Sequence, residues 1–526
     1  MGSNGPGSGY PSGSHTLDRR AFLKVGAGLG GLVFAGPLLA ACGGTTPSAS
    51  TGKNFTYAYA ADVETLDPLM TTDTTTENVA YQMFDTLVRM GADGNWQGEL
   101  AQSWENPDSR SWKFHLRQNV KFHNGEPFNA QTVKFSFDRI LDPKLKSPAA
   151  PGMAPFDHVQ VVDDATVVFV TKDPYAATLA QVYGLYIVPP QYIGQKGNDG
   201  FAANPVGTGP FTFVERQKAV HVKMQANANY WKGKPTVGTL TFRPIPEDAS
   251  RIAALQNGEV DWIAAVNVDR VKDLKTNSKL QIQSRPGQGI YGGMDTLKFK
   301  PFMDKRVRQA MNYGINMDSI VKNLLDGLAI RLPSALFSDS PGFDPKMAPY
   351  PYDPNKAKQL LSDAGYPNGF EVEFDLPVGL QSTQKFDQVG QAMQQDLAKI
   401  GVKANIKVID PGTAFDQYRA GKYQLFLYPW ASNHEAGVYI QTLLESDTRG
   451  YYYKNPQADT LIRQYMSTID ATQRANVGKQ MNQFFFDDCP WVYMYQEPDI
   501  YGYGSAINWK PNAYDAYFHA VDVKFQ

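Results

Sequence analysis

The stretch ELAQSWENPDSRSWKFHLRQNVKFHNGEPFNAQTVKFSFDRIL, which runs from Glu99 to Leu141, decides the fold that the sequence predicts. Within it, apolar residues alternate with polar ones, as they do in a strand with one buried face. The alternating apolar residues are Trp112, Phe114 and Leu116, followed by Val120 and Phe122. Asn124-Gly125 then predicts a turn, because both residue types tolerate positive φ.

A helix is predicted directly after this turn. Asn129 can cap its first turn, and Pro143 ends it, because proline cannot continue a helix. The apolar face of the helix would consist of Val133, Phe137, Ile140 and Leu141. Two strands, the turns predicted at Gln118-Asn119 and Asn124-Gly125, and a helix therefore form a compact structural unit, and this unit contains no pair of catalytic groups.

This stretch closely resembles the signature of the family 5 extracellular solute-binding proteins, the oligopeptide and dipeptide receptors of ABC importers. Three further segments are similar to sequence motifs of that family: NPVGTGPF at 204–211, NYWKGKP at 229–235 and LQNGEVD at 255–261. The resemblance covers about residues 55–525. It implies an α/β, periplasmic-binding-protein-like fold (type II, cluster C), with two lobes and an additional third domain. Independently, the alternation of predicted strands and helices argues for an α/β sheet protein.

The resemblance also divides the chain into expected parts. They are a signal over 1–42, a flexible tether over 43–53, lobe I over 54–95, 203–292 and 503–526, the extra domain over 96–202, and lobe II over 293–502. Two or three domains also suit a chain of 526 residues. Closure of the lobes over a ligand is expected to bend the two crossings, near 290–298 and 498–506.

Composition narrows the function classes. The formal net charge is −2, so the chain lacks the basic field that nucleic-acid binding needs. Aromatic residues are frequent, with 28 Tyr, 29 Phe and 8 Trp, and most of them should serve large cores.

The N-terminal segment indicates export. Basic residues precede an apolar run from Val25 to Ala41, which contains Gly and Pro and is too short to span a bilayer well. Arg19-Arg20 resembles a twin-arginine signal, and Leu39-Ala-Ala-Cys42 resembles a bacterial lipobox, which implies lipid on Cys42 after cleavage. The alternative is a membrane-retained N-terminal anchor. Cys489, the only other cysteine, is then expected to be a buried thiol.

A ligand is expected at residues 429–435, which follow the predicted strand 423–428. In open α/β sheets, ligands bind outside the carboxyl ends of strands. Trp430 offers a broad apolar face, and Ala431, Ser432, Asn433 and His434 complete the loop. Alternatively, Trp430 is a core residue under a surface loop.

The resemblance favours the ligand-binding interpretation, because the family carries a pocket Trp at this place. The peptide receptors, however, usually have Asp three residues after that Trp, where it pairs with the peptide ammonium. This chain has Asn433, which lacks a charge, and the exchange should weaken ammonium binding by about 1–3 kcal/mol. Asp62, Glu64 or Glu435 could supply the missing charge. An oligosaccharide or another neutral solute is the alternative ligand.

Three more residues are expected to bind ligand. Asp62 and Val63 lie in a loop that usually faces the cleft in the family, and Tyr291 lies where the chain crosses between the lobes.

The sequence contains little evidence for an enzymatic activity. Two GxGxxG matches occur, but the first lies in the export signal, and the second, at Gly287, Gly289 and Gly292, opens no helix. The seven histidines form no ligand-spaced cluster, and His115 and His123 are expected to be solvated. No cofactor and no metal are expected, and a secreted hydrolase remains a distant alternative.

Together these patterns predict a lipid-anchored receptor on the outer face of the cytoplasmic membrane, in the periplasm or at the cell surface. It would act as a monomer, bind a peptide or another small molecule without changing it, and deliver it to the separate permease subunits of an ABC importer.

Overall fold

The computed structural model describes residues 52–377, 384–431, 435–448 and 450–526. The predicted signal, including Arg19, Arg20 and Cys42, lies outside the described residues, as do Ser432, Asn433 and His434. Within the described ranges, no helix is both long enough and apolar enough to cross a membrane.

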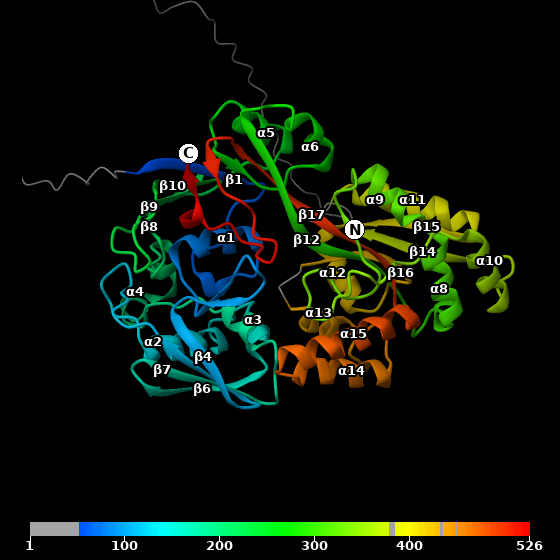
Figure 1. Ribbon diagram of the computed structural model, residues 1–526, viewed down its shortest axis with the longest axis horizontal. Helices are drawn as coiled ribbons and strands as arrows, with labels where there is room; N and C mark the ends of the chain where they lie inside the picture. The colour runs from blue at the N-terminus through cyan, green and yellow to red at the C-terminus, as the bar shows by residue number, and fades with distance from the viewer. Residues whose placement is uncertain (1–51, 378–383, 432–434, 449) are drawn as a thin grey trace, which may run out of the picture. The chain divides into compact units, whose positions relative to one another are not determined.

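Strands and helices alternate along most of the chain (Figure 1). The strands are β1 (Lys53–Tyr59), β2 (Val88–Met90), β3 (Trp96–Gly98), β4 (Ala101–Asp108), β5 (Ser111–Leu116), β6 (Phe156–Asp163), β7 (Thr166–Thr171), β8 (Phe211–Gln217), β9 (His221–Ala226), β10 (Val237–Pro244), β11 (Trp262–Ile263), β12 (Leu280–Met294), β13 (Ile330–Arg331), β14 (Phe370–Pro377), β15 (Val402–Ile409), β16 (Leu425–Trp430), β17 (Trp491–Gly504), β18 (Ile507–Asn508) and β19 (Lys524–Phe525).

The helices are α1 (Thr74–Met83), α2 (Ala130–Leu141), α3 (Thr178–Tyr183), α4 (Pro190–Ala203), α5 (Asp248–Gln256), α6 (Val268–Leu274), α7 (Lys300–Met303), α8 (Lys305–Gly314), α9 (Met317–Leu324), α10 (Pro354–Asp363), α11 (Phe386–Lys399), α12 (Pro411–Arg419), α13 (Ala436–Leu444), α14 (Pro456–Ser467) and α15 (Ala471–Asp488). Short 3-10 helices span Pro68–Met70, Ala150–Met153 and Ala520–Asp522.

One large sheet runs through the described chain in the order β15-β14-β16-β12-β17-β11-β1-β10-β9-β8, with β13 beside β17. The two long strands β12 and β17 pair antiparallel from Leu280–Gly504 to Gly293–Trp491, and they lie side by side in Figure 1. We call β11, β1, β10, β9 and β8 the first half of the sheet, and β16, β14 and β15 the second half. The two halves are therefore joined through a single pair of strands.

Residues 99–141 contribute β4, β5 and α2 to a second part of the fold, in which β6 and β7 complete a sheet of order β4-β5-β7-β6 and α2 covers it. Asn129 caps α2 as predicted, and its side chain accepts hydrogen bonds from the backbone of Gln131 and Thr132. Val133, Phe137 and Ile140 are buried, whereas Leu141 is 37% exposed at the helix end. The alternation at Val120 and Phe122 does bury both side chains, but the expected strand is only an isolated bridge between Lys121 and Pro127.

Glycine residues mark the ends of three helices. Gly258, Gly365 and Gly401 follow α5, α10 and α11 with positive φ, which glycine adopts without a Cβ clash. Along β15, alternate apolar side chains are fully buried only near the start of the strand. Val402 and Ala404 are buried, but Val408 is 63% exposed, because β15 is an edge strand of the sheet.

Cys489 is buried and free, as the sequence predicts. Tyr350 lies 3.0 Å from its sulfur atom, and burial raises the pKa of the thiol to about 12. The thiolate is therefore scarce at neutral pH, and Cys489 is a packing residue.

A buried ion pair fixes α2 against the loop that follows β1, and it offers a test of the fold. Arg139 donates to both carboxylate oxygens of Asp67, at 3.1 and 2.6 Å, and neither side chain is more than 6% exposed. Arg139→Met should lower the free energy of unfolding by about 3–5 kcal/mol, because it leaves the carboxylate buried without its partner.

Lys134→Met, on the same helix, removes a partly exposed pair with Asp138 and should cost about 0.5 kcal/mol or less. Urea unfolding followed by circular dichroism measures both changes. Equal midpoints for the two variants would contradict a structural role for the buried pair.

Candidate ligand-binding cleft

A cleft with three connected sections lies along α1, α3, α13 and the crossing strands β12 and β17. The first section, of about 280 Å³, is lined by Arg285 and Gln288 of β12, by Asp499 and Tyr501 of β17, and by Gln384. The second, of about 310 Å³, shares Thr74, Ala431, Ala516 and Tyr517 with the first. The third, of about 880 Å³, shares Gly152, Gln181 and Val438 with the second. The three sections together have room for an elongated solute.

Arg285 is the cation of the first section. Its Nη2 donates to Asp499 at 2.5 Å, and its Nε donates to the Tyr501 hydroxyl at 3.3 Å. Burial works against the charge, but Asp499 and Tyr501 outweigh it and hold the pKa of the guanidinium above its usual value. The side chain is 6% exposed, and its Nη1 is buried without a hydrogen-bond partner among the described residues. A buried donor of this kind is costly unless a ligand or water meets it.

Arg285 and Asp499 are directly paired in the sheet, and Gly287, two residues after Arg285, leaves room for the Asp499 side chain. A Cβ at Gly287 would lie 2.6 Å from Oδ1 of Asp499. Gly289 is similarly required, because a Cβ there would lie 2.0 Å from the ring of Phe337. The second GxGxxG match is therefore explained by close packing within the sheet.

Glu497 of β17 lies beside the first section, and its carboxyl is hydrogen-bonded to β12 and to the segment that contains Gln384. Its Oε1 accepts from the backbone of Gln384 at 2.9 Å, and its Oε2 accepts from the side chain of Gln288 at 3.2 Å. Burial raises the pKa of Glu497 to about 8, because no basic group faces it closely enough to offset desolvation. The carboxyl is therefore mostly protonated at neutral pH.

The second section is lined by two acids. Glu77 of α1 accepts from the Tyr517 hydroxyl at 2.7 Å, and burial raises the pKa of its carboxyl to about 7. Glu435 caps α13 by accepting from Gly437 at 3.0 Å, and it also forms a buried ion pair with Arg474. Glu435 is thus neutralised within the protein, whereas Glu77 is not.

The loop predicted to bind ligand borders this cleft in part. Ala431 lines both the first and the second sections. Trp430 ends β16 opposite Gly289, is half-buried, and packs against the core that contains Tyr439 and Trp491. A role for Trp430 in binding stays a prediction, and Ser432, Asn433 and His434 lie outside the described residues.

The other three predicted residues make contacts within the protein. Asp62 accepts from the backbone of Ala219 at 2.8 Å and forms an ion pair with Arg216 at 3.6 Å. The carbonyl of the buried Val63 accepts from the same arginine. Tyr291 is 4% exposed and stacks on Trp491, with ring centroids 4.3 Å apart. None of the three is among the described residues that line the three sections, and a role for them in binding stays a prediction.

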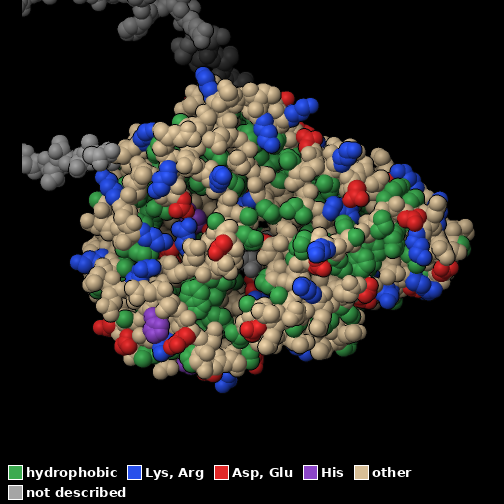
Figure 2. All heavy atoms as spheres, in the orientation of Figure 1, with side chains coloured by type: hydrophobic (Ala, Val, Ile, Leu, Met, Phe, Trp, Pro, Cys, Tyr) green, Lys and Arg blue, Asp and Glu red, His purple; other side chains and the backbone are tan. Residues whose placement is uncertain are grey.

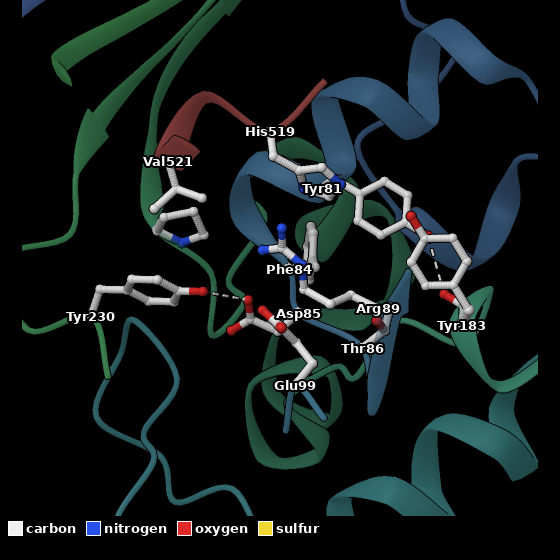
Figure 3. A pocket seen from close by; sticks show the side chains of 11 residues that line it. Tyr81, Phe84, Asp85, Thr86, Arg89, Glu99, Tyr183, Tyr230, His519 and Val521 are labelled. Carbon is white, nitrogen blue, oxygen red and sulfur yellow. Dashed lines mark hydrogen bonds between the residues drawn. The ribbon is translucent and has the colours of Figure 1, made fainter. Parts of the chain in front are cut away.

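A separate cavity, drawn in Figure 3, lies next to β2 and has a volume of only about 20 Å³, which is room for about one water molecule. Asp85 projects into it and accepts from Tyr230 at 3.0 Å and from Trp231 at 2.9 Å. Burial raises the pKa values of Asp85 and of the neighbouring Glu99, which pairs with Lys232. The cavity is too small for a solute, so this cluster is structural.

Metal binding has no candidate site in the described residues. No group of three His, Cys, Asp or Glu in them could hold a metal ion. His123, expected to be solvated, instead contacts the backbone of Gly209 at 2.9 Å, and burial lowers the pKa of its ring to about 4. Acidic and basic side chains are interspersed over the face shown in Figure 2.

Two sheet halves joined by one strand pair, with a polar cleft beside the crossing, define a class of solute-binding protein. A family model described as bacterial extracellular solute-binding proteins, family 5, matches residues 95–451. The chain belongs to this family, and the fold class that the sequence predicts is thereby confirmed.

Several relatives resemble nearly the whole chain. The glutathione-binding protein GsiB of Pectobacterium atrosepticum is 31% identical over 92% of this chain and 93% of its own length. The structure of HbpA2 from Haemophilus parasuis is 26% identical, with a TM-score of 0.79 over 90% of this chain and 100% of that one. DppA from Helicobacter pylori, an ABC transporter-associated periplasmic binding protein in complex with the peptide STSA, is also 26% identical, with a TM-score of 0.74 over 90% and 98%.

Sequence reasoning missed Arg285, Asp499 and Glu497. Glu497 and Asp499 are charged residues inside a long strand of mostly apolar and aromatic residues, and this is the signal that could have found these two. Arg285 stands among polar residues of β12, so the sequence gives no such signal for it. Their pairing could not be foreseen, because Arg285 and Asp499 are 214 positions apart in the chain.

Glu497 gives a pH-dependent prediction. Its folded pKa is raised, so its favourable contribution to stability is present at low pH and is lost as the pH rises through about 8. Glu497→Gln keeps an acceptor for Gln384 and removes the ionisation. The thermal unfolding midpoint of the wild type should therefore fall between pH 6 and pH 9, and that of the variant should fall less. Glu259→Gln, at an exposed site, is the control, and a decline of equal size in all three proteins would refute the assignment.

Proposed function

We propose that this protein is the extracytoplasmic receptor of an ABC importer and that it binds short peptides. Membership of the family supports a receptor, and the names of two relatives, one binding glutathione and one holding the peptide STSA, favour peptide-like ligands. The observation that carries the proposal is the buried Nη1 of Arg285 in the wall of the cleft, which has no hydrogen-bond partner among the residues that the structure describes. A carboxylate is the natural partner of such a group, and every unmodified peptide has one at its C-terminus.

Binding would depend on the charge of Arg285, on amide groups and on the flat tyrosine rings of the cleft. Arg285 remains charged because Asp499 stays beside it, so a ligand carboxylate can accept from Nη1 without disturbing that pair. Gln288 and Gln384 provide amide groups for the peptide backbone, and Tyr501 and Tyr517 provide flat apolar surface. These groups hold a solute without attacking it, as a receptor that releases its ligand unchanged requires.

Closure would use the strand pair that joins the two sheet halves. The register of β12 against β17 shifts between Pro286 and Gly289 and again between Ile290 and Tyr291. Such irregularities leave backbone groups unpaired and allow a strand to bend. We place the hinge at 286–291 and at the facing part of β17, and we retain the division into lobe I, lobe II and the extra domain as part of this proposal.

A neutral solute, such as an oligosaccharide, is the second candidate. It is favoured by the amide side chains of Gln288 and Gln384 in the first section and by the half-buried Trp430 beside Ala431. In that case Arg285 would meet hydroxyl groups or water in place of a carboxylate.

The predicted signal completes the proposal. Arg19-Arg20 would direct export, and lipid on Cys42 would hold the monomeric receptor at the outer face of the cytoplasmic membrane, close to its permease subunits. The expected tether, 43–53, is shorter than predicted, because β1 already begins at Lys53. Residues 43–51, rich in Gly, Ser and Thr, would link the lipid to the folded part of the chain.

Calorimetric titration tests the ligand class. The wild type should bind glutathione or trialanine, and it should bind the C-terminal amide of trialanine and maltotriose much more weakly. Arg285→Met should weaken binding by about 30-fold or more, because the ligand carboxylate loses a charged donor in a buried site.

Arg285→Lys, which keeps the charge but not the forked geometry, should lie between the two, and Arg110→Met, at an exposed site, should bind like the wild type. Preference for maltotriose over both peptides would favour the neutral-solute alternative. Unchanged peptide affinity in Arg285→Met would refute the role of Arg285.

The anchor is tested in cells. Wild-type protein should sediment with membranes and be released by detergent, whereas Cys42→Ser should be found in the soluble exported fraction, because it lacks the lipid. Membrane association of Cys42→Ser equal to that of the wild type would indicate a retained N-terminal anchor instead.

A further inference from the structure

The second section of the cleft has an excess of negative charge. The charged residues among its described lining are Glu77 and Glu435, and both are acidic. Arg474 already neutralises Glu435 from within the protein. Glu77 forms no ion pair with any described residue, and its only hydrogen-bond donor there is the Tyr517 hydroxyl, at 2.7 Å.

The groups around Glu77 come from four places in the fold, and none of them offers it a free cation. They are Tyr81 of α1 with the helix N-cap Asp73, Tyr517 of the C-terminal segment, Tyr183 at the end of α3 with the following Tyr186, and Glu435 with its partner Arg474 beside α13. Burial and the neighbouring Asp73 raise the pKa of Glu77 to about 7, while the hydrogen bond from Tyr517 opposes this effect. In the unliganded protein, the carboxyl is thus close to half-protonated at neutral pH.

Glu77 and Arg285 line two sections of the cleft that share lining residues. Arg285 lines the first section and Glu77 the second, and the residues that line both sections are Thr74, Ala431, Ala516 and Tyr517. Among the described residues, Nη1 of Arg285 has no hydrogen-bond partner and the Glu77 carboxyl has no cation. A solute that lies along Tyr517 can therefore meet a positive group at one end and a negative group at the other.

We propose that Glu77 receives the ammonium group of the ligand while Arg285 receives its carboxylate, so that the cleft selects a zwitterion of peptide type in one orientation. This inference rests on the proposed function and deepens it. Glu77 would supply the charge that Asn433 lacks. When the ligand binds, the O–H bond of the protonated Glu77 breaks, the proton passes to solvent, and the carboxylate accepts a hydrogen bond from the ammonium group.

The sign of the pH dependence follows from two ionisations. Below about pH 7, Glu77 must lose its proton before it can pair, so affinity should rise with pH. Above about pH 8, the peptide amine loses its own proton, so affinity should fall again. Binding at pH 6 should therefore release close to one proton per ligand, and binding at pH 8 should release far fewer from Glu77.

Titration calorimetry of the full-length exported protein with trialanine tests this, in phosphate and in imidazole buffers at pH 6 and at pH 8. The difference in observed enthalpy between the two buffers gives the number of protons released. Glu77→Gln keeps an acceptor for Tyr517 and cannot ionise. It should lose the proton release at pH 6 and should bind trialanine about tenfold or more weakly at pH 8. N-acetylated trialanine should bind the wild type and Glu77→Gln with equal affinity.

Glu259→Gln, at an exposed site, should behave as the wild type does, and thermal unfolding of each variant shows that it is folded. Trialanine binding without proton release at pH 6, or with unchanged affinity in Glu77→Gln, would overturn the role of Glu77 and leave the peptide receptor standing. Failure of the wild type to bind trialanine and glutathione at any pH would overturn the proposed peptide function and this inference with it.

Discussion

The antiparallel pairing of β12 with β17 is the constraint on which the structure depends. It is the only connection between the two halves of the described large sheet, and the first section of the cleft lies beside it. Each strand supplies one member of the Arg285–Asp499 pair, so the same contact that holds the strands in register also places a cation in the wall of the cleft. Gly287 permits the close approach of Asp499, and the fold and the site therefore share the same residues.

The electrostatics of the cleft differ from those of the surface. Surface ion pairs contribute little, because water screens them. Beside the cleft, burial raises the pKa of Glu77 and of Glu497, and Asp499 keeps Arg285 charged. Perturbed groups that collect around a cavity are typical of functional sites. The small cavity near Asp85 also contains perturbed acids, but their partners Tyr230, Trp231 and Lys232 satisfy them, and the volume admits only water.

The local parts of the fold could be predicted from the sequence. Residues 99–141 predict their own local structure well, because the cap at Asn129, the turn at Gly125 and the alternation through Phe114 all depend on residues close by in the sequence. The site could be predicted only in outline. Tyr291 lies at the crossing, as expected, but successive side chains of a strand point to opposite faces, and its ring packs into the core. Residue spacing cannot decide between these faces, and it gave no sign that Arg285 would meet Asp499.

The central claim is that a solute enters the cleft beside the crossing strands and that its carboxylate meets Arg285. A crystal structure of the protein with trialanine tests this most directly. The account predicts density for the peptide between Arg285 and Glu77, with a carboxylate oxygen within hydrogen-bond distance of Nη1 of Arg285. Peptide density elsewhere, with Nη1 of Arg285 bonded only to protein atoms, would contradict it.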